Sequence, residues 1–109
     1  MALLKGTLDV LVLKTLSWGP MHGFEITSWL ETRSGGRLDF TDAALLQALH
    51  RLEARALLSG EWGVTKNERR ARYYKLTPAG RAQLRAESAA LIDQFDALTT
   101  VLTAGSARG

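Results

Sequence analysis

The chain contains no cysteine, only two histidines and no long uninterrupted apolar run. Without cysteine no disulfide can form, so the fold is indifferent to the redox compartment. His22 and His50 are not at a metal-ligand spacing, so no metal site is expected. No Ser-His-Asp set, glycine-rich phosphate loop or carboxylate pair stands out. The sequence therefore predicts neither catalysis nor a cofactor.

The apolar N-terminal segment is unsuited to crossing a membrane. Lys5, Asp9 and Lys14 interrupt it, which leaves too much charge for a spanning helix. It also lacks the order of basic, apolar and cleavage regions that marks a signal peptide. We therefore expect a cytoplasmic protein with no membrane partner.

Positive charge is concentrated in the middle of the chain. The 109 residues carry a net charge of +3, and residues 41–80 hold seven basic and four acidic side chains, whereas both flanks are balanced. A local basic patch between neutral flanks is typical of a surface that binds a polyanion, although proteins that bind nothing often carry a similar excess. A domain this small would also gain stability from dimerisation.

The first predicted helix spans residues 3–16, which are apolar on nearly every side. A helix of this kind must be covered on more than one face, so we expect part of it to meet a second subunit. A buried strand over residues 10–13 is the alternative. The predicted dimer contacts on this helix are Leu4, Leu8 and Leu11.

A second helix is predicted over residues 22–32, after a turn at Ser17 to Pro20. It should end at Gly35-Gly36, because glycine readily takes the left-handed conformation of a helix stop. His22, at the turn, is expected to hydrogen-bond through its ring to nearby backbone. The apolar set of this helix is Phe24, Ile26, Trp29 and Leu30.

Residues 42–58 form the predicted third helix, with Thr41 or Asp42 as its N-cap. One stripe at helical spacing is apolar and consists of Leu45, Leu49, Leu52 and Ala56. The opposite stripe is small and polar at its start and basic further along. An ordinary amphipathic surface helix has the same pattern, but such a helix also suits the major groove of DNA with its N-terminal end leading. The predicted base-reading residues are Ala44, Gln47, Ala48 and Arg51.

After the third helix, the apolar period changes from that of a helix to that of a strand. Residues 59–64 and 72–76 predict a β-hairpin whose tip, residues 65–71, is polar and basic. This favours phosphate neutralisation, with one arginine reaching the minor groove, over a merely solvated tip. As an alternative, Arg51 and Arg55 would pair with Glu53 or with an acidic residue on another helix. The predicted DNA-backbone contacts are Arg55, Lys66, Arg69, Arg70, Arg72 and Lys75.

The last predicted helix begins at Thr77-Pro78, with threonine as N-cap and proline in the first position, and runs to about Leu102. Its apolar positions are spaced 4, 3, 4, 3, 4, with Ser88 filling one gap, which is a heptad-like seam. We predict that this seam meets a partner chain; the alternative is a helix folded back on its own core. The seam consists of Leu84, Leu91, Phe95, Leu98 and Leu102.

The expected element order is three helices, a two-stranded hairpin and a long closing helix. This mainly α fold with a small β-hairpin (α+β) is a winged helix-turn-helix with an added C-terminal dimerisation helix. We expect residues 1–77 to form a DNA-binding domain, residues 78–103 the dimerisation helix and residues 104–109 a flexible tail.

Several motifs of the chain resemble those of the PadR family of bacterial transcriptional regulators. They are LKGTLD at 4–9, Leu13 to Leu16, GPMHGF at 19–24, ALHRLE at 48–53, EWG at 61–63 and RRARYYKLTPAG at 69–80. The resemblance implies a homodimer that binds operator DNA, usually as a repressor. It also implies that the first and last helices make the dimer. The third helix would then enter the major groove, with the wing tip near the adjacent minor groove or phosphates.

The start of the third helix departs from the family pattern. The family typically has Gly-Ser/Thr-Leu-Tyr-Pro where this chain has Ala43-Ala44-Leu45-Leu46-Gln47. The hydroxyl groups that commonly meet DNA in the family are absent, so those contacts do not carry over. From geometry alone, Gln47 fits an adenine edge, and Ala44 or Leu46 fits a thymine methyl group.

Two hypotheses of function follow. The first is a dimeric DNA-binding repressor. The second is a dimeric winged-helix module for protein partners or ligand sensing, with weak or lost DNA reading, which the altered start of the third helix favours. Some PadR relatives bind flat aromatic compounds between their subunits. A small aromatic or hydrophobic effector would need a pocket lined by residues such as Trp18, Trp29 and Trp62, although single aromatics at these spacings are more often core.

Overall fold

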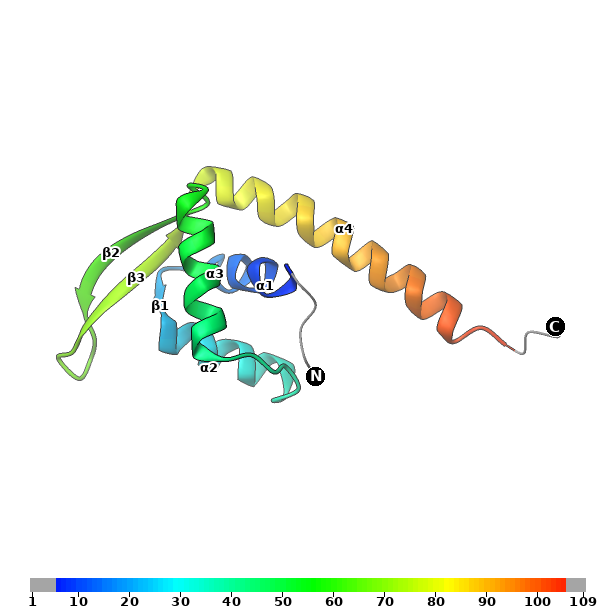
Figure 1. Ribbon diagram of the computed structural model, residues 1–109, viewed down its shortest axis with the longest axis horizontal. Helices are drawn as coiled ribbons and strands as arrows, with labels where there is room; N and C mark the ends of the chain where they lie inside the picture. Colours follow the sequence, from blue (N-terminus) through cyan, green and yellow to red (C-terminus); the bar gives the residue numbers. More distant parts are fainter. Residues whose placement is uncertain (1–5, 106–109) are drawn as a thin grey trace.

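The computed structural model describes residues 6–105, and in that range it contains four helices and three strands (Figure 1). The helices are α1 (Thr7–Leu16), α2 (Gly23–Ser34), α3 (Asp42–Ala54) and α4 (Pro78–Leu102), and the strands are β1 (Met21–His22), β2 (Leu58–Val64) and β3 (Arg70–Leu76). The predicted winged helix-turn-helix is confirmed, with one additional strand. Leu4 and the rest of the predicted first helix before Gly6 lie outside the described residues, as does the tail beyond Gly105.

The core lies where α1, α2 and α3 meet the base of the β2–β3 hairpin. Its largest fully buried leucines and isoleucine come from all of these elements: Leu13, Leu16, Ile26, Leu49, Leu52 and Leu58. Each such side chain contributes about 1.5–3 kcal/mol relative to an exposed one, so this cluster holds α3 firmly against the other helices. The alternative strand at residues 10–13 is excluded, because these residues belong to α1.

Helix α1 is covered mainly by its own chain. Leu8, predicted as a dimer contact, is only 8% exposed because it packs into the core. Leu11 is half-buried against the same core. Helices α2, α3 and α4 all contact α1. Leu8 is therefore not available to a second subunit, and the apolar character of α1 is largely explained within one chain.

Three helix starts are fixed by side chains that accept hydrogen bonds from the backbone. The hydroxyls of Thr41 and Thr77 each accept from the N–H three residues ahead at 3.0 Å, so Thr77 caps α4 as predicted and Thr41, not Asp42, caps α3. His22 Nδ1 accepts from Glu25 N at 3.4 Å, and the Glu25 carboxylate accepts from His22 N at 3.2 Å. The predicted ring-to-backbone hydrogen bond of His22 is confirmed, and it fixes the start of α2.

Helix α3 ends at Ala54, earlier than the predicted end at Leu58. Ala56 takes a left-handed conformation with φ 58°, which turns the chain so that Leu57 N donates to Leu52 O at 2.9 Å. Ala56 is consequently exposed and not part of the buried stripe, while Leu57 and Leu58 enter the core. The early stop sends the chain directly into β2.

The end of α3 and the start of α4 meet across the base of the wing. Thr77 N donates to Leu57 O at 3.1 Å, and Thr77 Oγ1 donates to Ala56 O at 2.7 Å. Gly80 is buried at the same place, where an added Cβ would lie 2.1 Å from Leu57 O. Only glycine allows α4 to approach the turn after α3 this closely.

The β2–β3 hairpin, which is the wing, is joined by β1 in an antiparallel sheet of order β1-β3-β2. Strand β1 pairs Met21 with Tyr74 and His22 with Tyr73. The sequence predicts only a turn before α2, because a strand of two residues has no periodicity of its own. It forms because β3 offers its free edge as a template.

Helix α4 projects away from the domain and gives the molecule its longest extent of 62 Å (Figure 1). Its first part packs on the domain, where Leu84 is half-buried against the core. The alternative of a helix folded back on its own core is wrong for the second half, since Phe95 is 45%, Leu98 48% and Leu102 81% exposed. Neither α4 nor any other helix within residues 6–105 is long and apolar enough to cross a membrane.

Candidate nucleic-acid interface

The outer face of α3 is rotated relative to the predicted one. Ala48 is fully buried and Ala44 is half-buried against the core, so Ala48 cannot reach a base and Ala44 faces largely inward. The predicted orientation is wrong at these two positions because alanine occurs both in cores and on surfaces. An alanine therefore does not indicate which side of a helix faces the core. The exposed positions of α3 are Asp42, Ala43, Leu46, Gln47, His50, Arg51 and Ala54.

Arg51 is exposed, but its side chain is held by another helix. Its Nη2 lies 2.7 Å from Asp9 Oδ1, and its Nε lies 3.4 Å from Asp9 Oδ2. This hydrogen bonding raises the pKa of Arg51 above its ordinary value. Pairing with an acidic residue on another helix was the predicted alternative to DNA contact. Arg51 is thus directed toward α1, which leaves Gln47 as the exposed polar base-reading candidate; Arg55 is exposed at the C-cap of α3.

The wing tip is a tight loop of residues 65–69 between β2 and β3. Thr65 N donates to Arg69 O at 2.8 Å, Arg69 N donates to the Thr65 hydroxyl at 3.2 Å, and Glu68 takes a left-handed φ of 60°. Lys66 and Arg69 are exposed, and neither forms an ion pair with any residue in the range 6–105. Because these hydrogen bonds already order the loop backbone, binding of an anion to the two cations costs little further backbone entropy.

Two arginines of β3 flank the indole ring of Trp62. The guanidinium carbon of Arg70 lies 4.7 Å from the ring centroid, and that of Arg72 lies 5.9 Å from it. Arg72 Nη2 also lies 2.6 Å from Glu53 Oε2 on α3, and this hydrogen bond raises the pKa of Arg72. The geometry does not support the prediction that Arg72 contacts the DNA backbone, since it joins the wing to α3. Arg70 and Lys75 are exposed on the wing.

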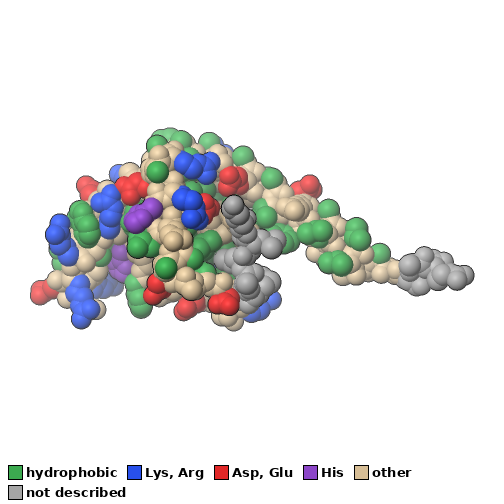
Figure 2. All heavy atoms as spheres, viewed as in Figure 1, with side chains coloured by type: hydrophobic (Ala, Val, Ile, Leu, Met, Phe, Trp, Pro, Cys, Tyr) green, Lys and Arg blue, Asp and Glu red, His purple; other side chains and the backbone are tan. Residues whose placement is uncertain are grey.

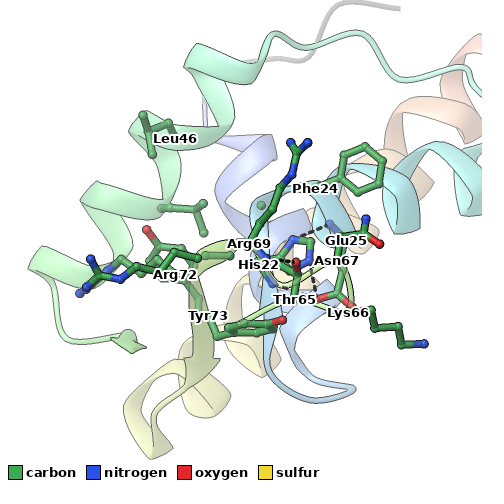
Figure 3. A pocket seen from close by; sticks show the side chains of 15 residues that line it. His22, Phe24, Glu25, Leu46, Thr65, Lys66, Asn67, Arg69, Arg72 and Tyr73 are labelled. Carbon is green, nitrogen blue, oxygen red and sulfur yellow. Dashed lines mark hydrogen bonds and ion pairs between the residues drawn. The ribbon is translucent and has the colours of Figure 1, made fainter. Parts of the chain in front are cut away.

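A cleft of about 820 Å³ separates the wing from α3 and the start of α2 (Figure 3). Cationic side chains of the wing line one side of it, and apolar side chains of the helices line the other together with the carboxylate of Glu25. In Figure 3, Arg69 extends from the wing toward the space between Leu46 of α3 and Phe24 of α2. The cleft therefore combines positive charge with apolar surface.

Phe24 belongs to this cleft although the sequence pattern placed it in the apolar set of its helix. It is 77% exposed, whereas Ile26 and Leu30 are the buried residues of α2. Residues that are two positions apart on a helix lie on nearly opposite sides. Because Ile26 faces the core, this spacing indicates that the ring of Phe24 faces outward.

Basic and apolar side chains are unevenly distributed over the surface of the molecule. Basic side chains gather over the wing and along the outer side of α3, whereas apolar side chains follow the projecting α4 (Figure 2). One surface suits a polyanion, and the other suits an apolar partner.

The sequence profile of the transcriptional regulator PadR-like family matches residues 12–86, a range that includes α2, α3 and the wing. The chain belongs to the PadR-like family. A PadR family transcriptional regulator from Eggerthella lenta is 27% identical, with a TM-score of 0.75 over 93% of this chain and 86% of that one. PadR of Bacillus subtilis, in complex with operator DNA, has the same fold at 20% identity, with a TM-score of 0.66 over 74% of this chain and 46% of that one.

Among sequence relatives, an uncharacterized 37.1 kDa protein in a transposon of Streptomyces fradiae is 40% identical over 80 residues. The match covers 73% of this chain but only 21% of that protein. This PadR-like regulator thus corresponds to one part of a much longer relative.

The region matched by the family profile contains every residue that lines the cleft. It also contains Ala43 to Gln47 at the start of α3. The cleft and the start of α3 therefore both lie in the part of the chain that matches the family.

Proposed function

We propose that this PadR-like regulator binds operator DNA as a homodimer, with α3 in the major groove and the wing on the adjacent backbone or minor groove. The observation that carries the proposal is the cleft between α3 and the wing, whose wing side presents Lys66, Arg69 and Arg70. A duplex offers base edges and phosphates side by side, and an exposed helix face beside unpaired cations complements both.

The homodimer is proposed to form through α4, with residues 78–102 as the dimerisation helix of a DNA-binding domain formed by the preceding residues. In the projecting half of α4, Phe95, Leu98 and Leu102 are exposed along one seam, and Leu91 is half-buried. A contiguous exposed apolar surface marks an interaction site, and a heptad-like spacing suits a second copy of the same helix.

Repression by occupancy is the proposed mode of action. In a two-fold symmetric dimer the two copies of α3 contact half-sites about one helical turn, roughly 10 bp, apart or a multiple of it. A dimer bound in this way covers DNA that polymerase must occupy. We place this activity in the cytoplasm, where operator DNA is accessible.

The apolar start of the outer face of α3 favours a second candidate function, a winged-helix module for a protein partner or a small aromatic effector. Ala43 and Leu46 have no hydrogen-bonding side-chain group, and the exposed Phe24 ring lies on the same side of the molecule. The basic wing argues against this candidate, because the cores of protein interfaces are depleted in charge.

Selection of binding sites from a random duplex library, with excess non-specific competitor DNA, tests the proposal. We expect enrichment of symmetric sites with two half-sites at the stated spacing. The double variant Phe95→Asp/Leu98→Asp should sediment as a monomer and lose the symmetric preference. Gln94→Asp, at an exposed position outside the seam, should retain both properties. Failure to enrich any sequence would contradict DNA binding and favour the second candidate.

A further inference from the structure

Two exposed apolar side chains lie on the face of the molecule that carries the cleft. Phe24 of α2 is 77% exposed and Leu46 of α3 is 50% exposed. Both line the cleft toward the wing, and both also line a second hollow of about 440 Å³ between α2 and α3. We call these two residues the apolar ridge. Because the ridge borders both hollows, a duplex that contacts the wing and α3 together also contacts the ridge.

The charges around the apolar ridge restrict which part of a duplex it meets. On the wing side, Lys66 and Arg69 line the cleft, and Arg69 extends toward the ridge (Figure 3). On the helix side, the carboxylate of Glu25 lines the cleft and those of Glu31 and Asp42 line the second hollow, and all three repel phosphates. The DNA backbone is therefore favoured on the wing side, and the ridge is left facing base edges.

The chemistry of the apolar ridge matches one group in the major groove. Phe24 and Leu46 have no hydrogen-bonding side-chain atoms, and the C5-methyl of thymine is the apolar group by which a base pair is distinguished there. We propose that the ridge reads thymine methyl groups within each half-site, an inference that rests on the proposed function. Gln47, next to Leu46 on the outer face of α3, carries an amide that fits an adenine edge. Ridge and amide thus select A·T base pairs.

The methyl contact can be measured in isolation. Deoxyuridine pairs as thymidine does and lacks only the C5-methyl group. Removal of one buried methyl-sized group corresponds to about a three- to fivefold loss of affinity. Replacing each thymine of the selected duplex in turn by deoxyuridine therefore maps the methyl groups that the protein contacts.

The test measures binding of the full chain to these duplexes. For the wild type we expect about three- to fivefold weaker binding at contacted thymines. In Leu46→Ala or Phe24→Ala the penalty at one of these positions should fall below about twofold, because the side chain that contacts the methyl group is gone. Val64→Ala is the matched control, since Val64 is 66% exposed and lines neither hollow, and it should retain the full penalty.

The outcomes separate this inference from the proposed function. If the wild type binds every deoxyuridine duplex as tightly as the parent, the inference is overturned while DNA binding stands. If the penalties are the same in Leu46→Ala, Phe24→Ala and the wild type, other residues read the methyl groups and the inference is likewise overturned. If no duplex is bound at all, the proposed function fails and the inference fails with it.

Discussion

Neutralising Arg69 and Arg70 together should flatten the salt dependence of DNA binding. Both are exposed, Arg70 is held against the Trp62 ring at 4.7 Å, and neither forms an ion pair within residues 6–105. Each phosphate contact contributes about 0.9 to the slope of log affinity against log salt. In the proposed dimer, Arg69→Gln/Arg70→Gln removes up to four contacts, so the slope should fall by about 3.6.

Between about 50 and about 200 mM salt, that difference changes the affinity ratio of wild type to variant by about 150-fold. Fluorescence anisotropy of a labelled operator duplex, titrated at several salt concentrations, measures both slopes. Arg81→Gln/Arg85→Gln is the matched control, because it removes the same charge from exposed positions on α4. We expect this control to keep the wild-type slope.

Two results would refute the reasoning about the wing. An unchanged slope in Arg69→Gln/Arg70→Gln removes the wing from the binding mechanism. Equal flattening in the α4 control shows that net charge, and not the position of the wing cations, sets the salt dependence.

Two further substitutions probe the packing behind the interface. Gly80→Ala should lower the free energy of unfolding by about 1–3 kcal/mol in urea titrations, because its Cβ would lie 2.1 Å from Leu57 O. Gly23→Ala, where nothing lies within 4 Å of the added Cβ, is its control, and equal losses would contradict the steric account. Asp9→Asn should cost less than about 1 kcal/mol, since its partner Arg51 is exposed. The same change releases Arg51 and should tighten DNA binding at low salt in anisotropy assays; an unaltered affinity would place Arg51 out of reach of DNA.

Much of the fold is predictable because its signals are local in sequence. Thr41 and Thr77 cap helices from the positions where the sequence suggests caps, and Gly35 ends α2 with a left-handed φ of 65°. The wing follows from a change of apolar period. The end of α3 is different, because the left-handed turn at Ala56 is imposed by the burial of Leu57 and the residues after it, which no local pattern reveals.

The candidate site is less predictable because it depends on contacts between distant residues. The ion pairs of Arg51 with Asp9 and of Arg72 with Glu53 join separate elements. The sequence alone does not distinguish these two paired arginines from Arg69, which forms no ion pair within residues 6–105. Strand β1 likewise depends on a distant strand. The orientation of α3 is uncertain from sequence wherever alanine occupies the helix.

The junction of Thr77 and Gly80 with Leu57 has a consequence for how such regulators diversify. The chain leaves the helical body at Leu57 and returns to it at Thr77, so the two ends of the wing are held together at one junction. Lengthening the wing costs little folding free energy, because loop-closure entropy grows only slowly with length. The angle between α3 and α4 is set at the junction itself, and in the proposed dimer that angle determines the distance between the two recognition helices. Wing length and operator spacing are therefore separate traits, and evolution can alter one while the other is kept.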